Sequence, residues 1–297
     1  MTPIDLAWRS ANPLPAVDGG ADKNSRGRVF AVGGSRKVPG ALQLSAEAAL
    51  RVGAGKVRMG TIDSAALPLG IAVPECGVIA LPEGENGEIG VAAAPAVAEQ
   101  IETCETFLFG PGMGGRSDVD ALTRRVIDRP RQGLSILLDA APLACAAGLE
   151  ELIAAHDGRA ILTPHHGELA YLTGQSEETI AARPDKAARD AARRFGGVVV
   201  LKHARTVIAT PDGETLVHDS DTPGLATGGS GDVLSGVLGG LLARGARPLV
   251  AAGWSVWLHG AAGRAAAEEV GPVGFLARDL LRHLPRLLAS NPIVRVG

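Results

Sequence analysis

The residues best suited to chemistry lie in one glycine-rich stretch, Thr222–Gly236, which reads TPGLATGGSGDVLSG. Its glycines surround a single acid, Asp232, and the apolar residues that follow recur at helical spacing as far as Arg244. Glycine lets backbone N–H groups converge on an anion, and the first turn of a helix adds free N–H donors and the positive end of its dipole. We therefore expect this loop to open into a buried helix and to hold a phosphate, while Asp232 takes a proton from an incoming hydroxyl.

An N-cap role is the structural alternative for Asp232, since aspartate is favoured at the start of helices. Capping alone does not require the glycines that precede the acid, which are Gly224, Gly228, Gly229 and Gly231. The sequence therefore favours catalysis at Asp232. The transferred phosphoryl group is assigned to the backbone N–H groups of Gly228, Gly229, Ser230 and Gly231.

Two further glycine-rich loops each follow a predicted strand. The first, Gly33–Ser35, continues into Pro39-Gly40-Ala41 and either holds a substrate or only turns the chain; it lacks the GxGxxG spacing of dinucleotide-binding sites. The second, Gly110–Gly114 (GPGMG), comes directly after an apolar strand, where open α/β sheets bind their ligands. We expect the second loop to approach a ligand, although tight turns use the same residue types.

Charged side chains end several predicted strands. Asp139, at the end of LSILLD, could bind a hydroxyl or a metal, or could cap the next helix. His165 and Glu168 lie where a strand meets a helix, so they could reach one ligand, with Glu168 near Mg²⁺ through water, or Glu168 could serve as a cap. Lys202 ends the run GVVVLK and is suited to a nucleotide phosphate or ribose, whereas His166 is expected to face solvent.

Strands and helices that alternate along the chain must position these groups. Apolar runs typical of strands buried on both faces occur at 28–33, 56–61, 76–81, 106–110, 134–139, 160–163 and 197–202. Helical patterns occur at 40–52, 94–101, 118–127, 169–172 and 186–195, and a hairpin is predicted from 207–210 to 214–218. This alternation predicts an α/β fold, with a mainly parallel central sheet and helices on both faces, as a single domain over 1–297. Residues 1–27 are expected to form an N-terminal arm, and the chain after the glycine-rich stretch is expected to be helical.

The 297-residue chain carries a net charge of −3 and no basic run, which argues against nucleic acid as a partner. It has no apolar stretch long enough for a membrane span, no N-terminal signal pattern, and three cysteines, Cys76, Cys104 and Cys145, that fit neither a metal site nor a disulfide framework. We therefore expect a cytoplasmic protein with reduced, buried thiols and no membrane contact. Trp254 and Trp257 are typical of a core or of a subunit contact, and we expect a homo-oligomer, with a tetramer as the candidate.

In chain order, the motifs GGS…PGA, GPGMG, LLDA, LTPHHGE, LK-x-A-x-TVI and PGLATGGSGDVLSG resemble those of the NAD(P)H-hydrate dehydratases, the repair branch of the ribokinase-like superfamily. The resemblance implies a ribokinase-like three-layer sandwich and a lyase (hydro-lyase). Such an enzyme uses ADP, or less commonly ATP, with Mg²⁺ to dehydrate the S-forms of NADHX and NADPHX, the hydrates of NADH and NADPH. With ADP it would release AMP and phosphate. The resemblance also implies the stand-alone form rather than a fusion to an epimerase domain.

Carried over residue by residue, the resemblance places the catalytic aspartate on Asp232 and the nucleotide contacts on Lys202, His203, Ala204, Arg205, Thr206 and Gly231. It places the contacts to the hydrate on Ala41, Gly112, His165 and Asp232. The chain departs from the family pattern at several points: Ala141 stands where a second acid is usual, His203 where glycine is usual and Ser230 where methionine is frequent. The asparagine that many members show before the glycine loop is also missing.

These residues suggest a mechanism in which the hydroxyl of the hydrate attacks the terminal phosphoryl group of the nucleotide while Asp232 accepts its proton. Phosphate then leaves far more readily than hydroxide. Two alternatives share the glycine loop. A ribokinase-like kinase for a vitamin alcohol or a sugar would release a stable phosphorylated product, and a nucleotide sensor would bind without turnover. A sensor has no need for the acid, so the presence of Asp232 favours an enzyme.

Overall fold

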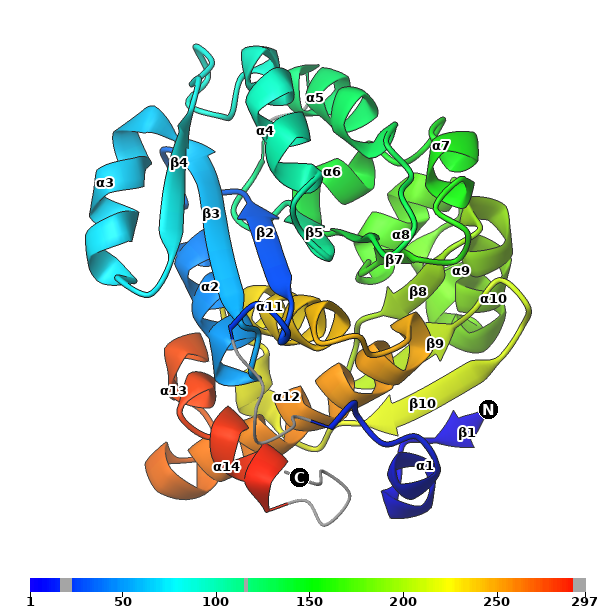
Figure 1. The fold of residues 1–297 in the computed structure, drawn as a ribbon. Helices are drawn as coiled ribbons and strands as arrows, with labels where there is room; N and C mark the ends of the chain where they lie inside the picture. Colours follow the sequence, from blue (N-terminus) through cyan, green and yellow to red (C-terminus); the bar gives the residue numbers. More distant parts are fainter. Residues whose placement is uncertain (17–22, 115–116, 291–297) are drawn as a thin grey trace.

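The computed structural model describes residues 1–16, 23–114 and 117–290, which form one sheet with helices on both of its faces (Figure 1). The strands are β1 (Thr2–Pro3), β2 (Arg28–Val32), β3 (Lys56–Ile62), β4 (Gly77–Leu81), β5 (Thr106–Phe109), β6 (Ser135–Leu138), β7 (Ala160–Leu162), β8 (Val198–Leu201), β9 (Arg205–Ala209) and β10 (Thr215–Asp219). The α-helices are α1 (Leu6–Ala11), α2 (Gly40–Arg51), α3 (Asp63–Ala72), α4 (Ala94–Ile101), α5 (Ser117–Ile127), α6 (Ala140–Ala144), α7 (Glu150–Ala154), α8 (His166–Thr173), α9 (Glu177–Ala182), α10 (Pro184–Phe195), α11 (Ser230–Ala243), α12 (Pro248–Val270), α13 (Ala277–Leu281) and α14 (Leu284–Ala289). Two short 3₁₀ turns, η1 (Val91–Ala93) and η2 (Pro223–Leu225), precede α4 and α11.

The strand order is β1-β10-β9-β8-β7-β6-β5-β2-β3-β4, and among the described strands only β9 runs against the others. The predicted mainly parallel sheet and the predicted hairpin of β9 and β10 are both confirmed. Strands β5 to β8 are buried along their whole length, which is why their sequences are continuously apolar rather than alternating.

The direction in which the sheet grows reverses at β2. Strands β3 and β4 extend the sheet on one side of β2, and β5 pairs with its other side. The loops that leave β2 and β5 therefore diverge from neighbouring strand ends, and open α/β sheets bind ligands at such a reversal.

Two helix layers complete the predicted three-layer sandwich. Helices α2, α11 and α12 pack on one face of the sheet, and α4 and α10 pack on the other (Figure 1). The interior of these layers is aliphatic, with a few large rings such as Trp254 and Phe107 completely buried.

Helix α11 lies against α2 with almost no side chain between them. A Cβ on Gly236 would lie 2.2 Å from the carbonyl oxygen of Ser45, and a Cβ on Gly240 would lie 2.5 Å from a methyl of Val52. Glycines four residues apart share one face of a helix, so both backbones approach along a line. The Ser45 hydroxyl also donates to the carbonyl oxygen of Asp232 at 2.9 Å, which ties the first turn of α11 to α2.

The N-terminal segment differs from the predicted arm. Residues Leu6–Ala11 form α1, whose first turn is capped by Asp5: the Trp8 N–H donates to the Asp5 carboxylate at 2.8 Å. The Arg9 guanidinium lies over the Trp257 ring, 3.8 Å from its centroid, so α1 is held by α12. A helix of this length is too short for a clear periodic signal, and residues 17–22 of the predicted arm lie outside the described residues.

Several helices have no counterpart in the prediction, namely α3, α6, α7 and α9. Helix α3 contains Pro68 and exposes Leu67 and Ile71, so its sequence shows neither a continuous helical pattern nor a one-sided apolar stripe. The predicted helical C-terminal region is confirmed for α11 to α14, while residues 291–297 lie outside the described residues.

The cysteines Cys76 and Cys104 are free and buried, and burial raises the pKa of both thiols to about 12. They therefore remain protonated and pack as small apolar groups, as the sequence predicts.

Trp254 belongs to the core, and its indole N–H donates to the carbonyl oxygen of Asn12. None of the described helices combines the length and the apolar character needed to cross a membrane.

Candidate active site

The glycine-rich stretch folds as a loop that leads into α11. The residue before the helix is Gly229, with φ of +87°, a conformation that side chains rarely adopt, and a Cβ there would lie 2.6 Å from a methyl of Leu44. Ser230 begins the helix and Asp232 lies in its first turn. Asp232 is therefore not the N-cap residue, and Gly229 supplies no side-chain cap. The free N–H groups of this first turn point toward the side where an anion would bind.

The Asp232 carboxyl is held in a state suited to proton transfer. Its pKa is raised to about 7, chiefly by burial and also by the charge of Asp139, while the charge of Lys202 opposes both. A base is most effective when its pKa lies near the working pH. The residue that the sequence predicts as the base therefore has a pKa in the range that suits proton transfer.

A buried ion pair lies behind Asp232. Asp139 follows β6 and accepts hydrogen bonds from Lys202 Nζ at 2.9 Å, Thr163 Oγ1 at 2.9 Å and Ser235 Oγ at 2.7 Å. Burial alone would raise the pKa of Asp139, but Lys202 and these hydroxyls hold the pKa below its ordinary value. Burial likewise opposes the charge on Lys202, and Asp139 and Glu168 raise its pKa above the ordinary value.

One of the roles that the sequence left open for Asp139 is wrong. Although it occupies the N-cap position of α6, its side chain makes no cap hydrogen bond. Its two carboxylate oxygens instead accept from Lys202, Thr163 and Ser235. Asp139 thus fixes the ammonium group of Lys202 beside Asp232.

His165 and Glu168 form a capping box at the start of α8. The Glu168 N–H donates to His165 Nδ1 at 3.2 Å, and the His165 N–H donates to Glu168 Oε2 at 2.8 Å. The capping alternative for Glu168 is therefore realised, and Lys202 Nζ lies 3.9 Å from the same oxygen. His166 does not simply face solvent: its ring stacks on that of His203, with centroids 4.5 Å apart and planes at 5°.

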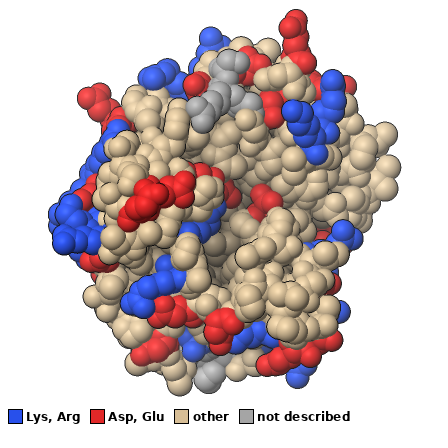
Figure 2. Space-filling model, turned by 180° about the vertical axis from the view of Figure 1, so that it is seen from behind, with Lys and Arg blue, Asp and Glu red and all other residues tan. Residues whose placement is uncertain are grey.

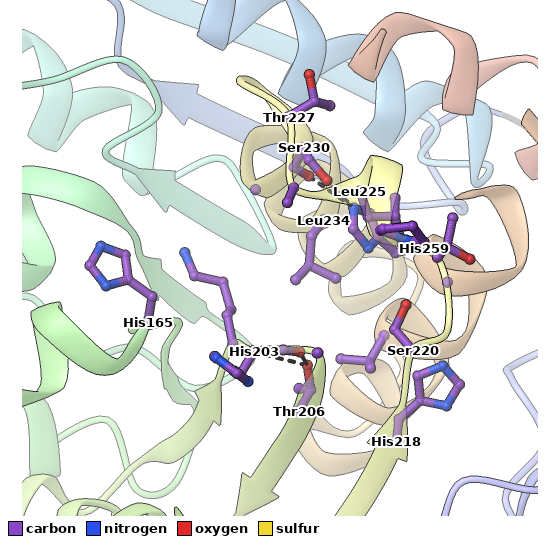
Figure 3. A pocket seen from close by; sticks show the side chains of 18 of the residues that line it. His165, His203, Thr206, His218, Ser220, Leu225, Thr227, Ser230, Leu234 and His259 are labelled. Carbon is purple, nitrogen blue, oxygen red and sulfur yellow. Dashed lines mark hydrogen bonds between the residues drawn. The ribbon is translucent and has the colours of Figure 1, made fainter. Parts of the chain in front are cut away.

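A cavity of about 810 Å³ opens beside Lys202 and the start of α11. Its wall is formed by His165, Lys202, His203, Ala204, Thr206, His218, Ser220, Asp221, Thr222, Pro223, Leu225, Ala226, Thr227, Ser230, Gly231, Leu234, Val256, His259 and Gly260. Figure 3 shows His203 and Thr206 on one side of this space and Ser230, Leu234 and His259 across from them. The volume suits a nucleotide-sized ligand.

Figure 2 shows the face behind that of Figure 1, with a hollow near its centre that has acidic and basic residues at one edge and mostly uncharged residues at the other. Among the described residues that line the cavity, the Lys, Arg, Asp or Glu side chains are those of Lys202 and Asp221, so most of its wall is uncharged. A largely apolar cleft with one cation at the end where a helix begins fits a ligand with an apolar body and an anionic end.

The structure brings together most of the residues predicted to contact the nucleotide. Lys202, His203, Ala204, Thr206, Ser230 and Gly231 line the cavity, and so does His165, which the resemblance assigned to the hydrate. Arg205 does not: it is exposed and pairs with Asp219 at 3.0 Å on the outer side of the hairpin. Gly228 and Gly229 form the loop next to the cavity but are not part of its wall.

The remaining predicted substrate residues lie at the reversal of the sheet. The Gly34 N–H donates to the Pro111 carbonyl oxygen at 2.7 Å, which joins the loop after β2 to the loop after β5. Gly112 has φ of +73°, and a Cβ there would lie 2.9 Å from the Cβ of Ala41. Ala41 and Gly112 are thus neighbours, at the ligand-binding edge that the topology predicts.

Several wall residues were not identified from the sequence, among them His218, Ser220, Leu225, Val256 and His259. His259 lies in the middle of α12, where the other residues from Pro248 to Ala262 are apolar or small, and no motif surrounds it. Only its position beside Ser230, which lies 29 residues earlier in the chain, gives it significance. A polar residue in the middle of a buried helix was the one signal available.

Comparison with known proteins first defines the class. The structure superposes on a ribokinase-like superfamily protein from Enterococcus faecalis with a TM-score of 0.82, at 24% identity, covering 98% of this chain and 96% of that one. The fold is therefore ribokinase-like, as the sequence predicts.

The family follows from the sequence matches. The model of the NAD(P)H-hydrate dehydratase family matches residues 29–286, and the chain belongs to that family. It is 41% identical to the ADP-dependent (S)-NAD(P)H-hydrate dehydratase of Xanthomonas campestris over 97% of this chain and 96% of that one. A Bacillus subtilis ADP/ATP-dependent NAD(P)H-hydrate dehydratase, co-crystallized with ATP and Mg²⁺, has a TM-score of 0.82 at 27% identity, with 98% of each chain covered. The chain spans about half the length of the bifunctional NAD(P)H-hydrate repair enzymes that it also matches.

Proposed function

We propose that this protein is a lyase that dehydrates the S-form of NADHX or NADPHX to NADH or NADPH at the expense of ADP, with ATP as the less favoured donor. Family membership and the name of the Xanthomonas campestris relative support the reaction. The observation that carries the proposal is Asp232, whose pKa is raised to about 7 in the first turn of α11, beside a nucleotide-sized cavity. We further propose that residues 1–297 act as one domain, in the cytoplasm and as a homo-oligomer.

In the proposed reaction, Asp232 accepts the proton of the hydrate's hydroxyl as that oxygen attacks the β-phosphoryl group of ADP, and AMP leaves. The N–H groups of the loop and first turn, from Gly228 to Gly231, together with Lys202, oppose the charge that develops on the phosphoryl oxygens. The C–O bond then breaks, phosphate departs with the bonding pair, and the lone pair of the ring nitrogen supports the carbon it leaves. Loss of a proton from the neighbouring ring carbon restores the double bond.

We assign the hydrated ring to the region of the sheet reversal. Ala41 lies in the first turn of α2 and Gly112 in the loop after β5, and a Cβ on Gly112 would lie 2.9 Å from that of Ala41. Helix α11 is fixed to α2 through Gly236 and Gly240, Asp232 lies one turn before Gly236, and Ala41 lies in the first turn of α2. We therefore propose that the hydroxyl approaches Asp232 from the side of α2.

A magnesium ion fits this site only as part of the nucleotide. Within the described ranges no three His, Cys, Asp or Glu side chains converge to hold an ion. Glu168 uses Oε2 for the capping box, and Oε1 takes part in no hydrogen bond with the described residues. Mg²⁺ characteristically keeps water and substrate phosphates around one or two carboxylates, so we propose that Glu168 holds it through water. When bound, the ion would offset phosphate charge.

The test combines the purified protein with NADHX, Mg²⁺ and either ADP or ATP, and follows the long-wavelength absorbance of the reduced nicotinamide together with released phosphate. We expect absorbance to return with ADP, at a rate that Asp232→Asn lowers by about 10² to 10⁴. A stable phosphorylated product from a vitamin alcohol or a sugar, without recovery of absorbance, would instead identify a ribokinase-like kinase. Nucleotide binding with no turnover of any hydrate or alcohol would identify a sensor.

A further inference from the structure

His259 and Ser230 meet at the inner end of the nucleotide cavity. The Nε2 atom of His259 lies 3.0 Å from the carbonyl oxygen of Ser230 and 2.8 Å from its hydroxyl oxygen. A carbonyl oxygen can only accept a hydrogen bond, so Nε2 must carry the hydrogen. The contact with the main chain therefore fixes the tautomer of His259, whatever the hydroxyl does (Figure 3).

The second ring nitrogen of His259 is then an acceptor. Burial lowers the pKa of His259 to about 4, with only the Ser230 carbonyl opposing it, so the ring is neutral at ordinary pH. A neutral ring with its hydrogen on Nε2 has a lone pair on Nδ1. Nδ1 forms no hydrogen bond with the described residues, and the ring is part of the cavity wall. The cavity wall thus includes an oriented acceptor at Nδ1 of His259, besides His218 Nε2 and Ser220 Oγ, which also have no hydrogen-bond partner among the described residues.

We propose that Nδ1 of His259 accepts a hydrogen bond from a ribose hydroxyl of the nucleotide and so makes His259 a specificity residue for ribonucleotides. The assignment rests on the proposed function, because it takes the phosphates to lie at the start of α11. Ser230 begins that helix, and His259 is in direct contact with it, so the group nearest the ring is the part of the nucleotide next to the phosphates. That part is the sugar, whose hydroxyls are its hydrogen-bond donors.

The neighbouring wall supports the sugar rather than the base at this position. Leu225, Ala226, Leu234 and Val256 supply apolar surface in the same cavity, close to Ser230 and His259, and such a surface suits the face of a base (Figure 3). On the opposite side, Lys202 lies with its ammonium group fixed by Asp139, which places the phosphates between Lys202 and α11. The sugar then lies between the cation and the apolar region, next to His259.

The first experiment needs no variant. Isothermal titration of the wild-type protein with ADP, 2′-deoxy-ADP and 3′-deoxy-ADP, each with Mg²⁺, compares ligands that differ by one hydroxyl. We expect one deoxy analogue to bind about 10-fold more weakly than ADP, because the missing hydroxyl leaves the Nδ1 acceptor of His259 without a donor from the ligand. If ADP binds and supports turnover while both analogues bind as tightly as ADP, the assignment of His259 is wrong and the proposed function stands. If ADP does not bind, both are wrong.

Two substitutions separate the roles of the two ring nitrogens. His259→Asn keeps an oxygen near the position of Nδ1 but loses the donor to Ser230, whereas His259→Gln keeps an amide N–H near the position of Nε2 and loses the acceptor. We expect the deoxy penalty to persist in His259→Asn and to disappear in His259→Gln. Ser230→Ala is the matched control, since it removes the hydroxyl but leaves the carbonyl contact that fixes the tautomer, and it should retain the penalty. An unchanged penalty in His259→Gln would overturn the proposal.

Discussion

Replacing Asp232 by asparagine should make the protein more stable and nearly inactive. The amide has the size of the carboxyl but carries no charge, so the substitution removes the desolvated negative charge and the base together. Activity should fall by about 10² to 10⁴, while nucleotide binding should persist because the backbone N–H groups of the first turn are unchanged. The substitution should raise the free energy of unfolding, whereas the loss of a stabilising contact would lower it.

The magnitude follows from the pKa of Asp232, which rises from the ordinary 3.8 to about 7 in the folded protein. A shift of about three units corresponds to about 4 kcal/mol at most, at 1.36 kcal/mol per unit. Between these two values the folded state retains a proton that the unfolded chain has released, so the stability of the wild type falls as the pH rises through this window. The gain from Asp232→Asn should therefore be small near pH 4, grow with pH and level off above 7.

Urea unfolding of both proteins between pH 4.5 and 8.5 measures this gain, and the exposed Asp219→Asn is the control, which should change stability by about 0.5 kcal/mol or less at every pH. In parallel, kcat/KM of the wild type should rise with pH and reach a plateau above about 7, where Asp232 is ionised. A stability gain that does not depend on pH would refute the claim that the folded protein disfavours the ionised form of the Asp232 carboxyl. Turnover near the wild-type rate would remove Asp232 from the role of base.

Three further substitutions test other parts of the structure. Lys202→Met should lower the free energy of unfolding by about 3 to 5 kcal/mol at pH 7, since Asp139 would remain buried without its cation, and urea unfolding measures this. Gly236→Val should destabilise the protein severely because its side chain would enter the backbone of α2, whereas Gly40→Ala, whose Cβ meets no atom, should be close to neutral; thermal unfolding compares them. Arg205→Ala should leave the KM for ADP within about twofold, because its guanidinium pairs with an exposed acid outside the cavity.

Much of the fold could be predicted because its central strands are buried on both faces. Runs such as 134–139 and 197–202 are apolar without alternation, and the structure places them in the middle of a parallel sheet. The glycine loop before α11 was equally clear, because the backbone at Gly229 needs glycine for its conformation and for its close approach to Leu44. Helix α3 was missed because it contains Pro68 and because its apolar residues lie on both sides, with Leu67 and Ile71 exposed and Leu69 buried.

The site could be predicted only as far as local patterns reach. Asp232, Lys202 and the His165–Glu168 pair each stand at the end of a recognisable strand or loop. The partners that set their properties come from distant segments: Ser235 and Thr163 hold Asp139, and His259 contacts Ser230. No spacing of residues in the sequence predicts these contacts, because they depend on how α11 and α12 pack on the sheet.

The glycine contact between α11 and α2 also limits how this site can change. Main chain meets main chain there, so the separation between the backbone of α11 at Asp232 and the backbone of α2 at Ala41 is set without any intervening side chain. Repacking of the surrounding aliphatic side chains would leave that separation untouched, while a single added carbon at position 236 or 240 would force the helices apart. Adaptation to another alcohol or another donor is therefore confined to the loops at the strand ends, whose residues can vary without moving the two backbones.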